Sequence, residues 1–209
     1  MEANEEPNVI ARKKASRKEL LTTLKALTPE ERREGDALIR RRLMSIPSYQ
    51  QAETLFAFVG DGWEVDTWPL IEDALAAGKR VAVPLCVTDT SERAFMRACL
   101  IRGREDLSRT QPWGLWEPEP GPRNPVIDPS DIDFAIIPCV ACDSRGRRLG
   151  RGGGFYDRFL AGSGFVKAAL CRDIVFGARI PTEPHDAPVD FVVTESRVID
   201  TAKVRDRTG

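Results

Sequence analysis

The stretch Phe134-Ala-Ile-Ile-Pro-Cys-Val140 is almost continuously apolar and lies between two polar segments. A short apolar run without alternation predicts a central β-strand that is buried on both faces. On its amino-terminal side, residues 54–59 and 80–85 predict two more strands, and residues 67–77, ended by Gly78, predict the helix that connects them. These segments form a predicted βαβ unit, the building block of parallel sheets.

The flanking segments extend this alternation of helices and strands. Leucines recur at helical spacing between Leu20 and Leu27, which predicts a first helix. The stretch 28–31 (Thr-Pro-Glu-Glu) has the residues of a capped helix start, so a second helix is expected up to about Ile46, where Pro47 stops it. Further expected elements are strands at 94–101, 167–170, 189–194 and around Val198, a helix from Phe155 and an ordered loop over 111–129. We therefore predict a single layered α/β domain over residues 1–202, with helices flanking a mostly parallel sheet, and a frayed polar tail at 203–209.

The composition argues against several classes of protein. The 209 residues are 42% hydrophobic, and 31 basic against 32 acidic residues give a formal charge of −1. This balance disfavours a protein that works on nucleic-acid backbones or anionic membranes. No stretch approaches the roughly 18 apolar residues of a spanning helix, and the first thirty residues lack the apolar core of a signal peptide. We expect a cytoplasmic protein whose partners are small molecules rather than nucleic acid or membrane. A monomer is expected, and an oligomer stays open.

The five cysteines are an odd number in a chain that is large enough to fold without bridges, which fits a reducing compartment. Cys139-x-x-Cys142 is compatible with zinc or redox chemistry, but the chain has no second pair and a single histidine, His185. We favour reduced, partly buried thiols over a metal site at these positions.

A loop rich in arginine and glycine follows the central strand: Arg148-Leu-Gly-Arg-Gly-Gly-Gly-Phe-Tyr-Asp157. Ligands in open α/β sheets bind beyond the carboxyl ends of the strands, and this loop lies there. Its four glycines let backbone N–H groups converge on one anion, and its two arginines supply planar donors for phosphate oxygens. The loop predicts a triphosphate site, although it matches neither the P-loop pattern nor the dinucleotide-binding pattern.

Three features of the chain have alternative interpretations. Asp157 in the first turn of its helix either stabilises the helix dipole or binds the Mg²⁺ of a nucleotide. The basic residues Lys13, Lys14, Arg17 and Lys18 at the start of the first helix are either a solvated face or an anion clamp. The Arg/Gly-rich sequence also resembles the RGG segments of RNA-binding proteins, although it occurs only once, in a protein with almost no net charge.

The same loop resembles the signature of the 5-formyltetrahydrofolate cyclo-ligases, also called methenyltetrahydrofolate synthetases. Other segments resemble that family's landmarks in the same order and span nearly the whole chain. These are Lys13-x-x-x-Arg17, Glu64-Val-Asp-Thr67, Lys79-Arg-Val-Ala-Val-Pro84, Trp113-Gly-Leu-Trp-Glu-Pro118, Glu183-Pro-His-Asp186 and Val192-Val-Thr-Glu195. The glycine-rich loop with Tyr-Asp is the specific part of the resemblance.

The resemblance implies an α/β fold similar to that of the CoA transferases and an ATP- and Mg²⁺-dependent ligase of one-carbon folate metabolism. In the implied reaction, ATP phosphorylates the formyl oxygen of 5-formyltetrahydrofolate, N-10 attacks, and 5,10-methenyltetrahydrofolate, ADP and phosphate are released. Two alternatives stay open, namely a related ATP-dependent enzyme with a different substrate and an RNA-binding protein that uses the Arg/Gly loop.

Site residues follow from the resemblance, position by position. Arg148, Arg151 and Tyr156 are the implied catalytic residues, Asp157 and Asp186 the implied Mg²⁺ ligands, and Val59, Glu64 and Trp113 the implied folate contacts. Trp113 is equally compatible with a buried apolar plug. The implied ATP contacts are Lys13, Arg17, Arg148, Leu149, Gly150, Arg151, Gly152, Gly153, Gly154, Phe155 and Tyr156.

Several positions depart from the family's pattern. Ser16 stands where leucine is usual, Leu85 where a basic residue often follows the proline, and Cys142 where an aromatic residue is common. The stretch from Phe176 to Pro181 is short and offers Arg179 near a place that often carries glutamine. We expect these positions to border the cleft, where they would alter folate affinity or the choice of substrate.

Overall fold

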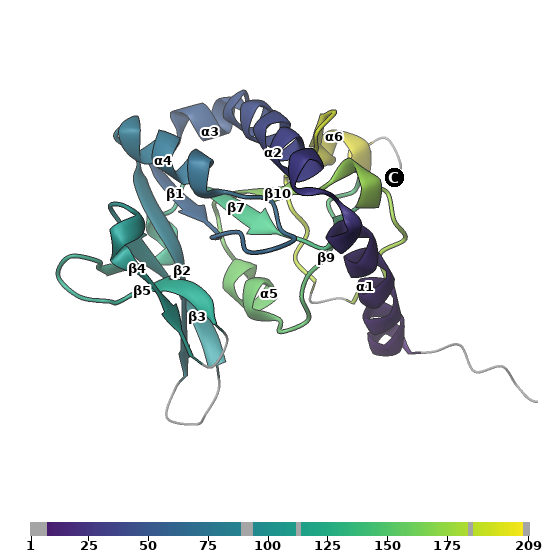
Figure 1. Ribbon diagram of the computed structural model, residues 1–209, viewed down its shortest axis with the longest axis horizontal. Helices are drawn as coiled ribbons and strands as arrows, with labels where there is room; N and C mark the ends of the chain where they lie inside the picture. Colours follow the sequence, from purple (N-terminus) through teal and green to yellow (C-terminus); the bar gives the residue numbers. More distant parts are fainter. Residues whose placement is uncertain (1–7, 89–93, 112–113, 184–185, 207–209) are drawn as a thin grey trace, which may run out of the picture.

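The computed structural model describes residues 8–88, 94–111, 114–183 and 186–206. Figure 1 shows helices on both sides of a central sheet. The helices are α1 (Val9–Ala26), α2 (Pro29–Met44), α3 (Pro47–Gln51), α4 (Trp68–Ala76), α5 (Phe155–Leu160) and α6 (Thr201–Asp206). The strands are β1 (Thr54–Ala57), β2 (Arg80–Thr88), β3 (Ala94–Ile101), β4 (Leu107–Thr110), β5 (Leu115–Pro118), β6 (Val126–Ile127), β7 (Phe134–Pro138), β8 (Ala141–Cys142), β9 (Arg148–Leu149), β10 (Val166–Leu170), β11 (Phe191–Val193) and β12 (Val198–Asp200).

The main sheet has eight strands in the order β12-β11-β10-β7-β1-β2-β3-β6. The five strands from β11 to β2 are parallel to their neighbours, and β12, β3 and β6 add antiparallel edges. The prediction of an α/β fold with a mostly parallel sheet is therefore confirmed, as is the βαβ unit of β1, α4 and β2. The central strand β7 is buried along residues 134–137, as its uninterrupted apolar sequence predicts.

Alternation along the strands divides the core into two layers. On one face, Phe56 and Ile137 pack in a cluster with Leu24 of α1 and Phe159 of α5. On the other face, Leu55, Ala57 and Ile136 pack in a second cluster with residues of α2, α3 and α4. Successive side chains of a strand point to opposite faces, so helices can bury both sides of the sheet.

Local signals explain most helix boundaries. The Thr28 side chain accepts a hydrogen bond from the Glu31 amide, and the Glu31 side chain accepts one from the Thr28 amide, which is the capping box that the sequence predicts for α2. Gly78 follows α4 with a φ of 79°, a conformation that glycine adopts without strain.

The structure differs from the sequence expectations at several places, and the short strands β4, β8 and β9 were not expected. Pro47 was expected to stop α2, and it is also the first residue of the short helix α3. At that position its missing N–H is harmless. The expected loop 111–129 contains the strands β5 and β6. Residues 203–206, expected in a frayed tail, belong to α6. No helix in the described part of the chain combines the length and the apolar character needed to span a bilayer.

Candidate active site

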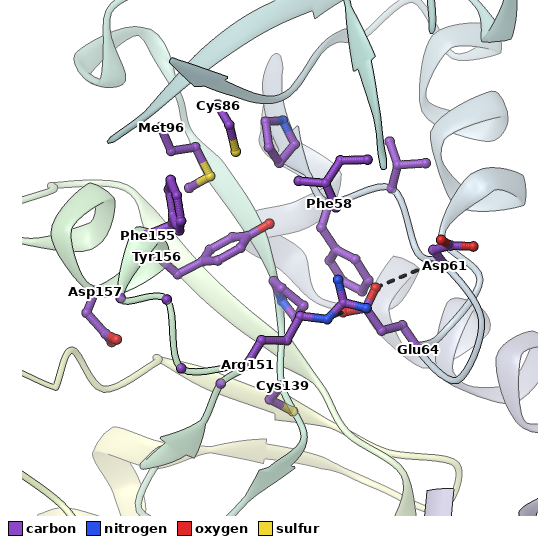
Figure 2. Close-up of a pocket in the computed structure, with 18 of the residues that line it drawn as sticks. Phe58, Asp61, Glu64, Cys86, Met96, Cys139, Arg151, Phe155, Tyr156 and Asp157 are labelled. Atoms are coloured by element: carbon purple, nitrogen blue, oxygen red, sulfur yellow. Dashed lines mark hydrogen bonds and ion pairs between the residues drawn. The ribbon is translucent and has the colours of Figure 1, made fainter. Parts of the chain in front are cut away.

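A cavity of about 340 Å³ opens beyond the carboxyl ends of β1 and β7 (Figure 2). One wall is the glycine-rich loop, which contributes Arg148, residues 150–154 and the start of α5. The opposite wall is the segment after β1, with Val59, Asp61 and Glu64. The sheet order makes this possible, because β1 and β7 are neighbouring parallel strands whose following loops leave the same edge.

The glycine-rich loop has the conformation of an anion cradle. It begins at β9, which pairs with β8 to form a small ribbon, and it ends at Gly154, which has a φ of 65° and precedes α5. Gly152 also has a positive φ, 102°. Among the described residues, no group accepts a hydrogen bond from the backbone N–H groups of residues 150–154. Free amides next to a helix start fit the phosphates of a nucleotide.

Arg148 is the buried arginine of this loop. Its side chain is 3% exposed, and Nη2 donates a 2.7 Å hydrogen bond to Oδ1 of Asp157. Its Nε atom is buried and has no partner within the described residues. A buried cationic donor with spare capacity fits an anionic ligand, because hydrogen bonds to charged groups are stronger than neutral ones.

Arg151 and Glu64 connect the two walls. Arg151 Nε lies 3.3 Å from Glu64 Oε1, and the Arg151 guanidinium stacks over the Trp63 ring at 5.2 Å from its centroid. The Glu64 side chain is only 6% exposed and also accepts a 3.2 Å hydrogen bond from the Asp61 amide. Burial raises the pKa of the Glu64 carboxyl, and the neighbouring Arg151 charge offsets part of that rise.

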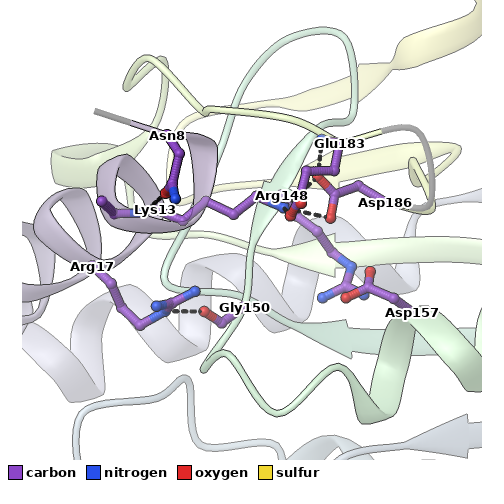
Figure 3. A network of polar contacts seen from close by, with 9 residues as sticks. Asn8, Lys13, Arg17, Arg148, Gly150, Asp157, Glu183 and Asp186 are labelled. Atoms are coloured by element: carbon purple, nitrogen blue, oxygen red, sulfur yellow. Dashed lines mark hydrogen bonds and ion pairs between the residues drawn. The ribbon is translucent and has the colours of Figure 1, made fainter. Parts of the chain in front are cut away.

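Helix α1 brings two cations to the loop from the other side, as Figure 3 shows. Arg17 Nε donates a 2.7 Å hydrogen bond to the Gly150 carbonyl. Lys13 Nζ donates to Glu183 Oε2 at 2.8 Å and to both carboxylate oxygens of Asp186 at 2.7 Å. Burial lowers the pKa of Lys13, but the hydrogen bonds to Asp186 and Glu183 together raise it by more, so the net shift is upward. Lys13 and Arg17 therefore belong to the surroundings of the site, whereas Lys14 and Lys18 of the same turns are exposed to solvent.

The remaining candidates lie in different environments. Tyr156 lines the cavity and contacts the Phe56 ring edge-on, and its pKa is raised well above the ordinary value, mainly because of burial. Phe155 also lines the cavity. Leu149 is buried in the core, and its carbonyl accepts a hydrogen bond from the Val140 amide. Trp113 lies outside the described residues.

The departures from the family's pattern were expected to border the cleft, but none of Ser16, Leu85, Cys142 and residues 176–181 lines the cavity that the described residues form. Leu85 is 7% exposed and Cys142 is fully buried. Their neighbours Pro84, Cys86 and Cys139 do line it. Alternation along β2 points Leu85 away from the ligand side, which the sequence pattern did not reveal.

Sequence reasoning missed Glu117, which lines the cavity and is 3% exposed. Its carboxylate accepts a 2.7 Å hydrogen bond from the Cys86 amide and a short one from the Thr110 hydroxyl. The signal was present in Trp113-Gly-Leu-Trp-Glu-Pro118, where one acidic residue stands inside an apolar stretch. Such a residue is seldom buried without a specific partner.

Comparisons with known proteins agree with this geometry. The model of the 5-formyltetrahydrofolate cyclo-ligase family matches residues 9–195. The chain is 34% identical over 177 residues to the 5-formyltetrahydrofolate cyclo-ligase of Escherichia coli K12, covering 83% of this chain and 95% of that protein. It is 35% identical over 175 residues to the enzyme of that name from Mycolicibacterium smegmatis, covering 82% of this chain and 88% of that protein. The solved structure of Aquifex aeolicus 5,10-methenyltetrahydrofolate synthetase superimposes with a TM-score of 0.78 at 29% identity, covering 90% of this chain and 92% of that one.

Proposed function

The chain belongs to the 5-formyltetrahydrofolate cyclo-ligase family, and on that premise we propose that it uses ATP to cyclise 5-formyltetrahydrofolate to 5,10-methenyltetrahydrofolate. The observation that carries this proposal is the 3.3 Å pair of Arg151 and Glu64, which joins the anion cradle to a buried carboxylate across one cavity. A phosphate donor and a polar ring with N–H groups can therefore meet in a single site.

The reaction needs a phosphate donor because the formyl oxygen of an amide is a poor leaving group. Transfer of the γ-phosphoryl group to that oxygen gives an iminium phosphate, N-10 attacks its carbon, and phosphate departs as the ring closes. Phosphoryl transfer asks the protein for positioning and for charge neutralisation on the phosphate oxygens. We propose that Arg148, Arg151 and the amides of residues 150–154 provide both, and that Arg17 and Lys13 close the site from α1.

We further propose that Asp157 and Asp186 hold the Mg²⁺ of the nucleotide, since hard carboxylate oxygens are the ligands this ion prefers. The ion would neutralise phosphate charge. In the structure these two carboxylates are paired with cations, Asp157 with Arg148 and Asp186 with Lys13. Binding of Mg·ATP would break both ion pairs, because the two cations can turn to the phosphates and the two carboxylates can turn to the metal.

The folate is proposed to lie against the opposite wall. Glu64 would accept hydrogen bonds from the N–H edge of the pterin, with Val59 and Trp113 as contacts to the ring. Tyr156 closes the cavity between the two substrates.

We also propose that the protein acts in the cytoplasm as a monomer.

A turnover assay tests the function directly. Purified protein with Mg·ATP and 5-formyltetrahydrofolate should form the methenyl product, which is followed by its near-ultraviolet absorbance, with ADP release as a second readout. ATP binding without any turnover would instead favour a related enzyme that serves another substrate. Salt-sensitive RNA binding that survives Glu64→Ala would favour an RNA-binding protein that uses the Arg/Gly loop.

A further inference from the structure

Three cysteines converge below the glycine-rich loop, although they are far apart in the sequence. Strands β7 and β10 are parallel neighbours in which Pro138 is paired with Leu170, so the next residues, Cys139 and Cys171, stand side by side. The chain then turns into β8 and brings Cys142 to the same place. The Sγ atoms of these three residues all lie within 4.8 Å of one another.

The backbone of this cluster is held by hydrogen bonds. The Cys171 amide donates to the Val193 carbonyl at 3.0 Å, and the Cys142 carbonyl accepts from the Gly177 amide at 2.9 Å. Cys142 and Cys171 are buried, and Cys139 lines the cavity. All five cysteines of the chain are free thiols, and the Cys139 and Cys171 thiols donate hydrogen bonds to the carbonyls of Leu170 at 3.1 Å and Arg172 at 3.5 Å.

The spacing of the sulfur atoms is close to that of a three-coordinate thiolate site. With metal–sulfur bonds of about 2.3 Å, three sulfurs in a plane around one ion are about 4.0 Å apart. Separations within 4.8 Å therefore need only a small contraction, which rotation of the side chains can supply. No carboxylate or histidine of the described residues joins the three sulfurs, which disfavours zinc because structural zinc sites are almost always four-coordinate.

The neighbouring thiols and burial raise the pKa of Cys139, Cys142 and Cys171 well above the ordinary value, so these thiols ionise only when a metal ion replaces their protons. The buried Arg148 guanidinium lies close enough to act on Cys139 and Cys142. When three thiols bind a monovalent ion, three protons leave to solvent, three metal–sulfur bonds form, and the complex has two net negative charges. Arg148, whose guanidinium is ion-paired with Asp157, keeps a buried Nε atom nearby that has no partner among the described residues.

We propose that Cys139, Cys142 and Cys171 form a binding site for one soft, monovalent, thiophilic metal ion of the Cu⁺ class, next to the nucleotide loop. Thiolate ligands select soft ions. The site is separate from the Mg²⁺ site proposed at Asp157 and Asp186, whose ligands are hard oxygens. Its occupancy links to the loop through β8, since Cys142 pairs with Arg148 of β9.

The test is a titration of the reduced, full-length protein with Cu⁺ under nitrogen, in competition with a chromophoric Cu⁺ chelator. One ion per chain is expected, with the near-ultraviolet absorbance of copper–thiolate bonds. Cys142→Ser and Cys171→Ser should each weaken binding at least tenfold, because losing one ligand costs no less than the 10- to 100-fold that loss of a second-shell partner costs. Cys99→Ser, a buried cysteine that is remote from the cluster, should bind like the original protein.

Alkylation mapping by mass spectrometry makes the result independent of how the variants fold. Bound Cu⁺ should protect Cys139, the member of the cluster that lines the cavity, from a thiol reagent and leave Cys86, which also lines it, unprotected. The proposal is overturned if the original protein takes up no Cu⁺, if Cys142→Ser and Cys171→Ser bind it as tightly as Cys99→Ser, or if Cys86 alone is protected.

Discussion

Arg151 Nε and Glu64 Oε1 lie 3.3 Å apart, which joins a residue of the loop after β9 to a residue of the loop after β1. The pair stands between the two halves of the cavity, and its partners differ in exposure, with 48% for the arginine side chain and 6% for the glutamate side chain. The arginine can therefore turn to an incoming phosphate, whereas the carboxylate stays fixed by the Asp61 amide. Binding of ATP and binding of folate are expected to be coupled through this pair.

Arg151→Ala should weaken ATP binding without unfolding the protein. Loss of a charge-assisted hydrogen bond of about 1.5–3 kcal/mol corresponds to a rise in the Kd for Mg·ATP of roughly 10- to 150-fold. Stability should also fall, because the Glu64 carboxylate, which is 6% exposed, loses its charge partner, and denaturant unfolding measures this loss separately. Calorimetric titration with a nonhydrolysable ATP analogue measures the effect, and Arg145→Ala, an exposed position in the turn between β8 and β9, is the control. Equal affinities of the two variants would remove Arg151 from the nucleotide site.

Glu64→Gln should change both folate binding and the pH dependence of stability. Burial raises the pKa of the Glu64 carboxyl, so the folded chain holds this proton more tightly than the unfolded chain does. The free energy of unfolding therefore falls as pH rises from the ordinary value of about 4.3 through the raised value, and Glu64→Gln should flatten this fall.

Denaturant unfolding at several pH values measures this slope, with the exposed Glu119→Gln as the control. The KM for folate should rise about tenfold or more in Glu64→Gln, because an amide accepts fewer hydrogen bonds than a carboxylate does. In the original protein, kcat/KM for folate should fall as pH falls through the raised pKa. An unchanged KM for folate would contradict our division of the cavity.

Asp157→Asn and Asp186→Asn should each raise the Mg²⁺ concentration needed for half-maximal activity. We expect about tenfold per carboxylate, since a charged oxygen ligand is replaced by a neutral one. The control is Asp131→Asn, an exposed aspartate far from the loop in sequence. A Mg²⁺ titration at fixed ATP measures the effect, and identical curves for all three variants would exclude both carboxylates as ligands.

Gly60→Ala should damage the folate side of the cavity by a steric route. A Cβ at this position would lie 2.0 Å from the Val65 carbonyl oxygen, so the loop that carries Asp61 and Glu64 must shift. Overpacking of this kind costs about 1–3 kcal/mol of stability. Thermal unfolding and the KM for folate measure the two effects. Gly121→Ala, where a Cβ meets nothing within 4 Å, should be neutral.

The amino-acid sequence by itself determined the elements that depend on local signals. Three such signals each act over only a few residues, so they can be recognised from the sequence alone. They are the uninterrupted apolar sequence of β7, the capping residues of α2 and Gly78 after α4. The glycine-rich loop belongs to the same class, because glycines and arginines next to a strand end are enough to predict an anion site there. The residue roles carried over from the family came from resemblance rather than from these signals.

Only the tertiary structure decided which distant side chains meet. Arg17 bonds Gly150 across 133 positions of the chain, and Cys171 stands beside Cys139 because β10 pairs with β7 in one particular register. The burial of Glu117 and the orientation of Leu85 away from the cavity have the same origin. Strand order and register result from packing the whole core at once, and local periodicity does not encode them.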